Sequence, residues 1–282
     1  MEGEARAGVV SGLSGRRILV LEARLPSILA DLVARRGGEA VCVPVAVEVE
    51  APASAVAAPL GLLCARKVDL VVLQTGVGTV CLHRQATGLG LGDAYLETLR
   101  SLPVAVRGPK PAAILHRWGI HPALAARSPY TTDELCAALA EHPMSEKTAF
   151  VQHYGEMNER LREYLQRRGA TTVDALPYRW ALPANLDPLR KAVAGLQAGA
   201  FDALLITSRP QVTHLFEVAE AQGEGGALRE ALNSRVTVAV VGPVARRALD
   251  RRGVRAGVEP SHPKMAPLVD ALAAHFAQAG AP

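Results

Sequence analysis

The chain has 282 residues, of which 49% are hydrophobic and 21% charged, and it contains 25 glycines and 19 prolines. This composition is typical of globular proteins, and it excludes a collagen, a coiled coil and a wholly disordered chain. The net charge of +4 is not gathered into a tail, and only 4% of the residues are aromatic, so the sequence does not indicate nucleic-acid binding.

Cysteines and apolar runs indicate the compartment. The cysteines form neither a CxxC pair nor a zinc spacing; they are Cys42, Cys64, Cys81 and Cys136. Charged residues interrupt every apolar run before it reaches the roughly 18 residues of a membrane span. The N-terminal residues also lack the apolar run of a signal peptide. We therefore expect a cytoplasmic protein that does not enter a membrane.

Apolar, β-rich runs alternate along the chain with stretches of helical period. In chain order the runs are residues 18–23, 69–75, 103–108, 149–154, 202–208 and 236–242. Continuous apolar runs predict strands that are buried on both faces. Strands that alternate with helices predict parallel sheets covered by helices on both sides. The sequence therefore predicts an α/β fold of doubly wound parallel sheets.

The two halves of the chain resemble each other. Residues 68–75 resemble 201–208, residues 107–109 resemble 241–243, residues 134–140 resemble 267–273, and residues 35–37 resemble 167–169. The matches occur in the same order and at nearly the same displacement. They predict an internal duplication of one unit of about 130 residues, which is the size of a domain.

Doubly wound sheets bind ligands at the carboxyl ends of their strands. The residues that close the predicted strands are therefore candidate binding residues: Thr75, Gly76, Arg107, Gly108, Lys110, Tyr154, Gly155, Ser208, Arg209, Gly242 and Pro243. Glycine lets the backbone approach a ligand, and the N–H groups at a helix start favour anions. An anionic small molecule fits this pattern, although each Gly-Pro pair is equally consistent with a tight turn alone.

Common catalytic motifs are missing from the sequence. The Gly76 and Gly78 pair lacks the third glycine of GxGxxG, and there is no GxxxxGK[ST]. Ser208 follows a strand, but no GxSxG motif surrounds it, and no histidine pair has the spacing of a metal site. Cys81 and Cys136 lie in apolar stretches that are typical of a core. We expect no cofactor and no metal.

Five segments carry a resemblance to a known family: residues 75–76, 106–108, 176–178, 206–210 and 240–249. Their order and spacing resemble those of the uroporphyrinogen-III synthase family, from about residue 17 to about residue 274. The resemblance implies two similar domains. One comprises residues 1–45 and 180–282, and the other comprises residues 46–179. Residues 43–49 and 175–181 would be the two extended linkers that join them, and we expect a monomer.

The resemblance also implies an activity. Members of this family are lyases that close the linear tetrapyrrole hydroxymethylbilane into uroporphyrinogen III in haem, sirohaem and cobalamin biosynthesis. Water is lost, and ring D is inverted through a spiro intermediate. Tyr178 matches the family's interdomain tyrosine, and we expect it to donate to the departing hydroxyl. Arg107, Lys110 and Arg209 would meet substrate carboxylates.

This chain departs from the family pattern in two places. Ala245 and Pro111 stand where several members have threonine after the Gly-Pro-like turns, and His153-Tyr154-Gly155 stands where many bacterial members have an Arg-Gly turn. These departures leave open an alternative, a non-catalytic regulatory module of the same fold that binds a tetrapyrrole or another anion. An NAD-dependent dehydrogenase is a further alternative, which the incomplete glycine pattern disfavours.

Overall fold

The computed structural model describes residues 12–22 and 28–279. By internal contacts the chain divides into unit 1, which comprises Met1–Val47 and Leu182–Pro282, and unit 2, which comprises Glu48–Ala181. The assignment of domains, and their origin by duplication, stay predictions. Ala23, the last residue of the first predicted apolar run, lies outside the described residues.

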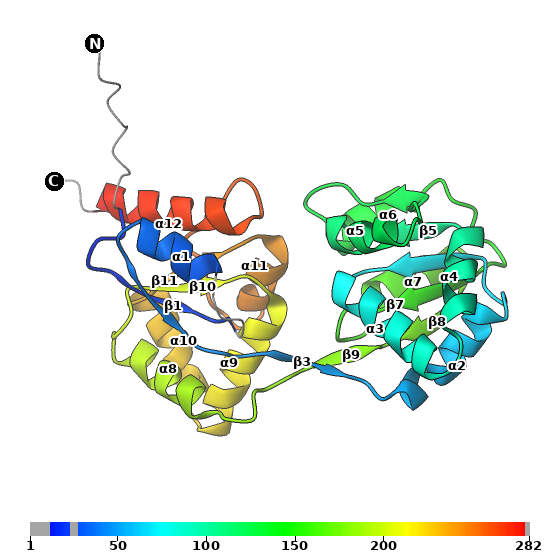
Figure 1. Cartoon of the computed structure of the whole chain (residues 1–282). Helices are drawn as coiled ribbons and strands as arrows, with labels where there is room; N and C mark the ends of the chain where they lie inside the picture. The colour runs from blue at the N-terminus through cyan, green and yellow to red at the C-terminus, as the bar shows by residue number, and fades with distance from the viewer. Residues whose placement is uncertain (1–11, 23–27, 280–282) are drawn as a thin grey trace, which may run out of the picture. The chain divides into compact units, whose positions relative to one another are not determined.

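Unit 1 contains a parallel four-stranded sheet of order β11-β10-β1-β2. The strands are β1 (Arg17–Val20), β2 (Glu39–Cys42), β10 (Ala203–Ile206) and β11 (Thr237–Val240). The helices are α1 (Ile28–Arg35), α8 (Asp187–Gln197), α9 (Arg209–Ala221), α10 (Gly225–Ser234), α11 (Pro243–Asp250) and α12 (Met265–Ala279). Figure 1 shows α1 and α12 over one face of this sheet and α8 to α10 over the other.

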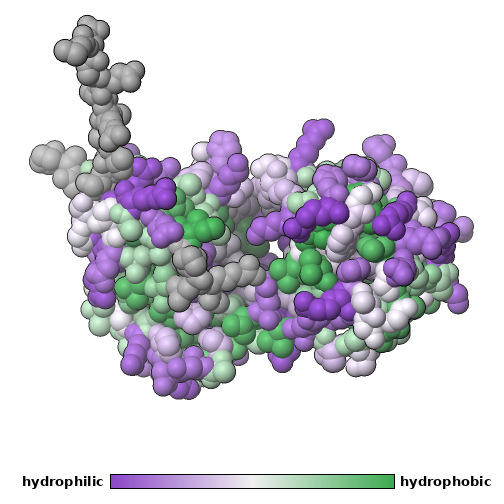
Figure 2. Space-filling model, viewed as in Figure 1, coloured by the Kyte–Doolittle hydropathy of each residue, from purple (hydrophilic) through white to green (hydrophobic). Residues whose placement is uncertain are grey.

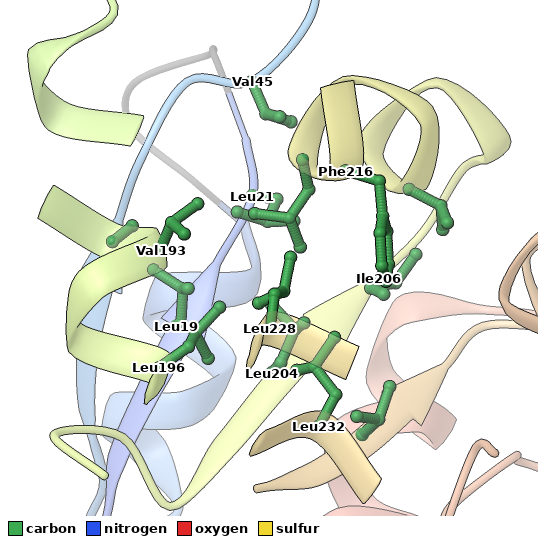
Figure 3. Packing of buried hydrophobic residues seen from close by; sticks show 14 of the residues in the cluster. Leu19, Leu21, Val45, Val193, Leu196, Leu204, Ile206, Phe216, Leu228 and Leu232 are labelled. Atoms are coloured by element: carbon green, nitrogen blue, oxygen red, sulfur yellow. The ribbon is translucent and has the colours of Figure 1, made fainter. Parts of the chain in front are cut away.

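Alternate residues of the strands of unit 1 enter two separate cores. Leu19 and Leu204 pack with Leu196, Phe216 and Leu228 from the helices α8 to α10 (Figure 3). The intervening residues of the same strands pack against α1 and α12 on the opposite face. Both faces are apolar, because side chains on a strand alternate and helices cover the sheet twice.

Unit 2 contains a parallel five-stranded sheet of order β6-β5-β4-β7-β8. The strands are β4 (Leu70–Leu73), β5 (Val104–Val106), β6 (Leu124–Ala125), β7 (Thr148–Gln152) and β8 (Thr171–Ala175). The helices α2 (Ala53–Cys64), α3 (Gly76–Gly88), α4 (Gly92–Ser101) and α5 (Pro109–Arg117) pack on one face, and α6 (Thr132–Ala138) and α7 (Glu159–Arg167) pack on the other.

The α/β class with parallel sheets, predicted from the sequence, is confirmed. Each apolar run overlaps a strand of one of the two sheets: β1, β4, β5, β7, β10 and β11. A separate two-stranded sheet pairs β3 (Val47–Glu50) with β9 (Tyr178–Ala181). These strands overlap the segments expected to be extended, residues 43–49 and 175–181, and the chain passes between the units at residues 47/48 and 181/182.

Local sequence explains where several helices begin and end. Thr131 and Glu134 form a capping box at the start of α6. Gly37 and Gly169 follow α1 and α7 with φ of 85° and 83°, a conformation that favours glycine. The matching Arg-Arg-Gly sequences therefore have the same role in both units.

Figure 2 shows hydrophilic and apolar residues interspersed on the visible face of the chain. The large exposed apolar side chains include Ile28, Leu89 and Val244, and single apolar residues on a surface are normal. No helix in the described ranges combines the length and the apolar character needed to cross a membrane.

Two tyrosines of unit 2 should respond oppositely to loss of their hydroxyl group. The Tyr95 hydroxyl is buried with no hydrogen-bond partner among the described residues, whereas the Tyr164 hydroxyl donates to the Cys136 carbonyl at 2.8 Å. Tyr95→Phe is expected to raise the free energy of unfolding by about 1 kcal/mol and Tyr164→Phe to lower it by about 1 kcal/mol. Urea unfolding measures both. Equal losses in the two variants would contradict the contacts described.

Candidate functional site

The topology of unit 2 makes the carboxyl ends of β4 and β7 a candidate ligand-binding position. The helix that follows β4 packs on one face of the sheet, and the helix that follows β7 packs on the other. Neighbouring strands whose connections diverge in this way leave a crevice, which is where α/β sheets bind ligands. Thr75, Tyr154 and Gly155 follow these two strands.

The side chain of Gln152 lies beneath this candidate position, against the backbone at the ends of β4 and β7. It is fully buried at the end of β7, and its Oε1 accepts from the backbone N–H groups of Gln74 at 3.0 Å and Thr75 at 3.1 Å. Its Nε2 donates to the Thr75 hydroxyl at 3.3 Å and to the His153 carbonyl. The amide therefore satisfies two backbone donors that no strand can pair.

Gly78 is required by Gln152. A Cβ at this position would overlap the amide nitrogen of Gln152, so no larger residue fits beside it. Its backbone N–H donates at 3.1 Å to the hydroxyl of Thr75, which caps the start of α3. The incomplete glycine motif in the sequence therefore reflects packing against a glutamine.

Tyr178, the first residue of β9, lies against this cap. Its hydroxyl lies 3.3 Å from the Thr75 Oγ1, and the residue is only 2% exposed. Burial raises the pKa of Tyr178 to about 12, an effect that outweighs the lowering by the Thr75 contact and the Arg107 charge. The phenol therefore keeps its proton at neutral pH and is a hydrogen-bond donor. Gln74, Thr75, Gly78, Gln152 and Tyr178 are called the Gln152 cluster below.

Trp180 holds the loop after β7 beside Tyr178. Its indole N–H donates to the Tyr154 carbonyl at 3.1 Å, and its ring meets the Tyr178 ring edge-on at 5.7 Å. Gly155 has φ of 83°, and a Cβ there would lie 2.5 Å from Trp180 and 3.0 Å from Tyr178. Only glycine is therefore compatible with both the backbone and the packing.

Arg107 lies at the carboxyl end of the strand beside β4 and forms no ion pair among the described residues. It follows β5 and is half-buried, and its guanidinium lies 4.6 Å from the centre of the Tyr154 ring. Burial lowers the pKa of Arg107, but an arginine remains charged at neutral pH. Within the described ranges no carboxylate forms an ion pair with it. A partly desolvated cation without a counter-ion is suited to bind an anionic group.

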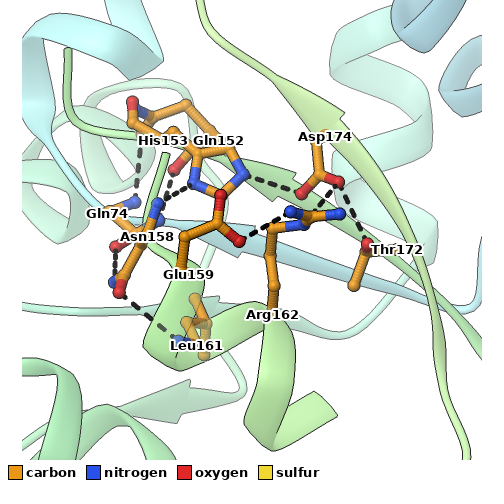
Figure 4. Close-up of polar contacts among 9 residues, drawn as sticks. All are labelled: Gln74, Gln152, His153, Asn158, Glu159, Leu161, Arg162, Thr172 and Asp174. Carbon is orange, nitrogen blue, oxygen red and sulfur yellow. Dashed lines mark hydrogen bonds and ion pairs between the residues drawn. The ribbon is translucent and has the colours of Figure 1, made fainter. Parts of the chain in front are cut away.

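A second buried group fixes the loop from the other side (Figure 4). His153 is fully buried, its Nδ1 accepts from the backbone N–H of Asn158 at 3.0 Å, and its Nε2 lies 2.7 Å from Asp174. Because Nδ1 accepts, the ring proton is on Nε2 and points to the carboxylate. Arg162 forms an ion pair with Asp174 at 3.1 Å. We interpret His153 as an anchor of the loop that carries Tyr154.

The start of α5 offers fewer backbone N–H donors than a helix start usually does. Gly108 is the N-cap of this helix, and Pro109, Lys110 and Pro111 follow it. Proline has no N–H group, so Lys110 supplies the one N–H of these three residues. Its side chain is exposed, and its Cβ lies 3.3 Å from the position a Cβ would take at Gly76.

The remaining candidates lie in unit 1. Ser208 is the N-cap of α9, and Arg209 is its first residue; Gly242 is the N-cap of α11, and Pro243 is its first residue. Because β10 and β11 are neighbours in a parallel sheet, all four residues follow the carboxyl ends of adjacent strands. These four binding roles, like those in unit 2, stay predictions.

Sequence reasoning missed three residues of the unit 2 site. Gln152, Trp180 and Asp174 make its main contacts, but none was expected to take part. A polar residue at the end of an apolar strand was the available signal for Gln152. No group of three or more His, Cys, Asp or Glu in the described part of the chain could hold a metal ion.

Comparisons with known proteins agree with this architecture. The family model described as uroporphyrinogen-III synthase HemD matches residues 27–270. YjjA, an uncharacterised protein of Bacillus subtilis, is 29% identical over 265 residues, which cover 94% of this chain and 97% of YjjA.

Solved structures show the same relationship. A crystal structure of a mutant uroporphyrinogen III synthase from Thermus thermophilus has a TM-score of 0.74 and 27% identity, and the match covers 94% of this chain and 99% of that one. The uroporphyrinogen-III synthetase of Helicobacter pylori, with 12% identity and a TM-score of 0.55 over 93% and 99% of the chains, shares the fold.

A methyl group at Gly155 should disturb Trp180. Gly90 has a similar φ of 74° with open space around it, so Gly90→Ala isolates the backbone strain, expected to cost about 1 kcal/mol. Gly155→Ala is expected to cost about 2 kcal/mol more and to change tryptophan emission, because the added methyl overlaps the indole ring. Urea unfolding and fluorescence measure these effects. Equal costs with unchanged emission would contradict the packing described.

Asp174 should stabilise the fold in a pH-dependent way. Burial alone would raise its pKa, but hydrogen bonds from His153 and Thr172 and the Arg162 charge lower it overall. A lowered pKa gives stability above the unfolded value near 3.9 that is lost as the pH falls through the folded value. Asp174→Asn is therefore expected to cost about 2 kcal/mol at pH 7 and progressively less below pH 4.

Glu97→Gln is the matched control for this pH dependence, because Glu97 forms an exposed pair with Arg66 at 2.9 Å. Its cost should stay under about 0.5 kcal/mol at either pH. Unfolding free energies measured at pH 7 and pH 3 decide the matter. A cost of Asp174→Asn that is the same at both pH values would contradict the role assigned to the carboxylate.

Proposed function

The chain belongs to the uroporphyrinogen-III synthase family, and we propose that it catalyses the cyclisation of hydroxymethylbilane to uroporphyrinogen III. The substrate class is a linear tetrapyrrole whose rings carry acetate and propionate groups. The observation that carries the proposal is the pairing of a cation and a phenol in unit 2. Arg107 has no counter-ion among the described residues, and both Arg107 and Trp180 contact Tyr154 next to Tyr178.

This pairing suits the two requirements of the substrate. A carboxylate arm needs a cation, and Arg107 is half-buried, which strengthens its attraction for an anion relative to that of a solvated side chain. The hydroxymethyl group needs a hydrogen-bond donor, and burial keeps Tyr178 protonated by raising its pKa to about 12. A side chain that only accepts hydrogen bonds could neither bind the carboxylate nor donate to the hydroxymethyl group.

The proposed mechanism begins with loss of the hydroxyl group. Electrons of the pyrrole nitrogen break the C–O bond as Tyr178 donates to the departing oxygen, which leaves an azafulvene, and the overall loss is one water. The substituted carbon of ring D then attacks the azafulvene carbon. The resulting spiro intermediate fragments and closes again with ring D inverted.

The chain's main task in this mechanism is orientation. The free carbon of ring D would give the uninverted isomer, so the product depends on which carbon is held within reach of the azafulvene. Correct positioning of two reacting groups can supply about 7–11 kcal/mol of the barrier. This accounts for a site in which the proposed contacts to the substrate come from a phenol and a cation. We expect the chain to act without a cofactor, as a monomer in the cytoplasm.

A second candidate function is a non-catalytic module that binds a tetrapyrrole or another anion. The features that favour it are at the helix starts. Pro111 and Ala245 are buried where several family members have a hydroxyl, and Pro109 and Pro111 remove N–H groups from α5. Such a module would bind the substrate but would leave the isomer ratio unchanged.

Tyr178→Phe should separate catalysis from binding. Removal of the donor is expected to lower the rate of type III formation by about 100-fold or more, because that is the usual contribution of a positioned proton donor. The Michaelis constant should change by less than about threefold, since the carboxylate contacts remain. The measurement is timed conversion of hydroxymethylbilane, followed by oxidation and chromatographic separation of the type I and type III isomers.

Tyr164→Phe is the control for this variant, because it removes a hydroxyl from the same unit at a distance from Thr75 and Arg107. Its rate of type III formation should equal that of the unmodified chain. An unchanged rate in Tyr178→Phe would contradict the role proposed for the phenol.

A further inference from the structure

The hydroxyl oxygen of Thr75 has three polar neighbours. Gly78 N lies at 3.1 Å, Gln152 Nε2 at 3.3 Å, and the Tyr178 hydroxyl at 3.3 Å. The first two are N–H groups and can only donate. A threonine hydroxyl accepts two hydrogen bonds and donates one. Both acceptor positions are therefore taken, and the Thr75 hydrogen points to the oxygen of Tyr178.

This direction leaves the Tyr178 hydrogen without an acceptor among the described residues. Tyr178 donating to Thr75 would instead place three donors on one oxygen and leave the Thr75 hydrogen unpaired. Because Tyr178 is only 2% exposed, bulk water is a poor substitute for a missing acceptor.

The orientation of Gln152 is fixed by the backbone. Its Oε1 faces the N–H groups of Gln74 and Thr75, so its NH₂ group must face the Thr75 hydroxyl and the His153 carbonyl. In the reversed orientation the NH₂ group would face the N–H groups of Gln74 and Thr75, and Oε1 would face the His153 carbonyl, so neither could form a hydrogen bond. Gln152 thus decides which way the Thr75 hydroxyl points.

We infer that Gln152 is a positioning residue that turns the Thr75 hydroxyl toward Tyr178 and so keeps the phenolic hydrogen of Tyr178 free for the departing hydroxyl of the substrate. The catalytic part of this inference rests on the proposed function. The direction of the hydrogen bond rests on the contacts of the Gln152 cluster alone.

Unit 1 contains the same amide contact without the tyrosine. Gln211 Oε1 accepts from the N–H groups of Thr207 and Ser208 at 2.6 and 3.1 Å, and its Nε2 donates to the Leu21 carbonyl. Gln211 follows Ser208 by three residues, as Gly78 follows Thr75, and by strand register Leu21 corresponds to Gln152. A glutamine amide thus accepts from the two N–H groups that follow the strand in both units, but it comes from α9 in unit 1 and from β7 in unit 2. In unit 1 its Nε2 donates to Thr207 and not to the capping Ser208.

This difference between the units suggests a variant that separates the effect of Gln152 on stability from its effect on the direction of the Thr75 hydroxyl. Gln152→Leu combined with Gly78→Gln gives unit 2 the unit 1 arrangement, which caps the backbone N–H groups but gives the Thr75 hydroxyl no second donor. Its urea midpoint is expected to be close to that of the unmodified chain. Its kcat should fall by roughly tenfold or more with KM within about threefold. A double variant that keeps both the kcat and the urea midpoint of the unmodified chain would overturn the inference.

Gln152→Glu is the second variant. A carboxylate still accepts from the Gln74 and Thr75 N–H groups but cannot donate to the Thr75 hydroxyl. Its kcat is expected to fall by roughly tenfold, and in a Tyr178→Phe background it should cause no further fall, because Gln152 acts through that phenol. Additive losses in the double variant would indicate a role independent of Tyr178 and would overturn the inference.

Neutron diffraction from deuterated crystals of the unmodified chain tests the hydrogen positions without any assay of activity. The inference requires deuterium on Thr75 Oγ1 pointing to Tyr178 and the phenolic deuterium pointing away from Thr75. A phenolic deuterium directed at Thr75 Oγ1 would overturn it. A chain that shows the required deuterium positions but forms no type III isomer would refute the proposed function and leave the hydrogen-bond direction standing.

Discussion

The buried amide of Gln152 is the contact on which the unit 2 site depends. Where β4 and β7 end side by side, their connections diverge to opposite faces of the sheet, and the N–H groups of Gln74 and Thr75 lose their strand partners. An unpaired buried N–H costs about 1–3 kcal/mol. One amide satisfies both, and in doing so it requires glycine at position 78 and places the Thr75 hydroxyl against Tyr178.

A site organised in this way is suited to reactions that depend on geometry. Its polar groups are fixed by backbone contacts, Arg107 has no ion pair among the described residues, and the tyrosine remains protonated. Fixed dipoles need no reorganisation when charge develops in a reaction. Cyclisation with inversion of one ring needs a held substrate, a donor to the leaving oxygen and a counter-charge for carboxylates. Our proposal assigns the last two to Tyr178 and Arg107.

The sequence predicted the sheets because continuous apolar runs have few alternatives to buried parallel strands, and it predicted candidate residues because parallel strands end at one edge. It did not predict Gln152, because a polar residue at the end of β7 looks the same whether its side chain turns inward or outward. Trp180 was missed because its contact with Tyr154 joins segments far apart in the chain. The start of α5 has fewer N–H donors for an anion than expected, because Pro109 and Pro111 have none. The prediction rested on the Gly-Pro turn and did not take the missing N–H groups into account.

We propose that this chain determines which carbon of ring D closes the macrocycle. The most direct measurement is a single-turnover reaction with the purified chain in excess over hydroxymethylbilane and no cofactor added, in which the type I and type III products are oxidised and separated by chromatography. The account predicts that nearly all of the product is type III. A folded chain that leaves only the spontaneous type I isomer would contradict it.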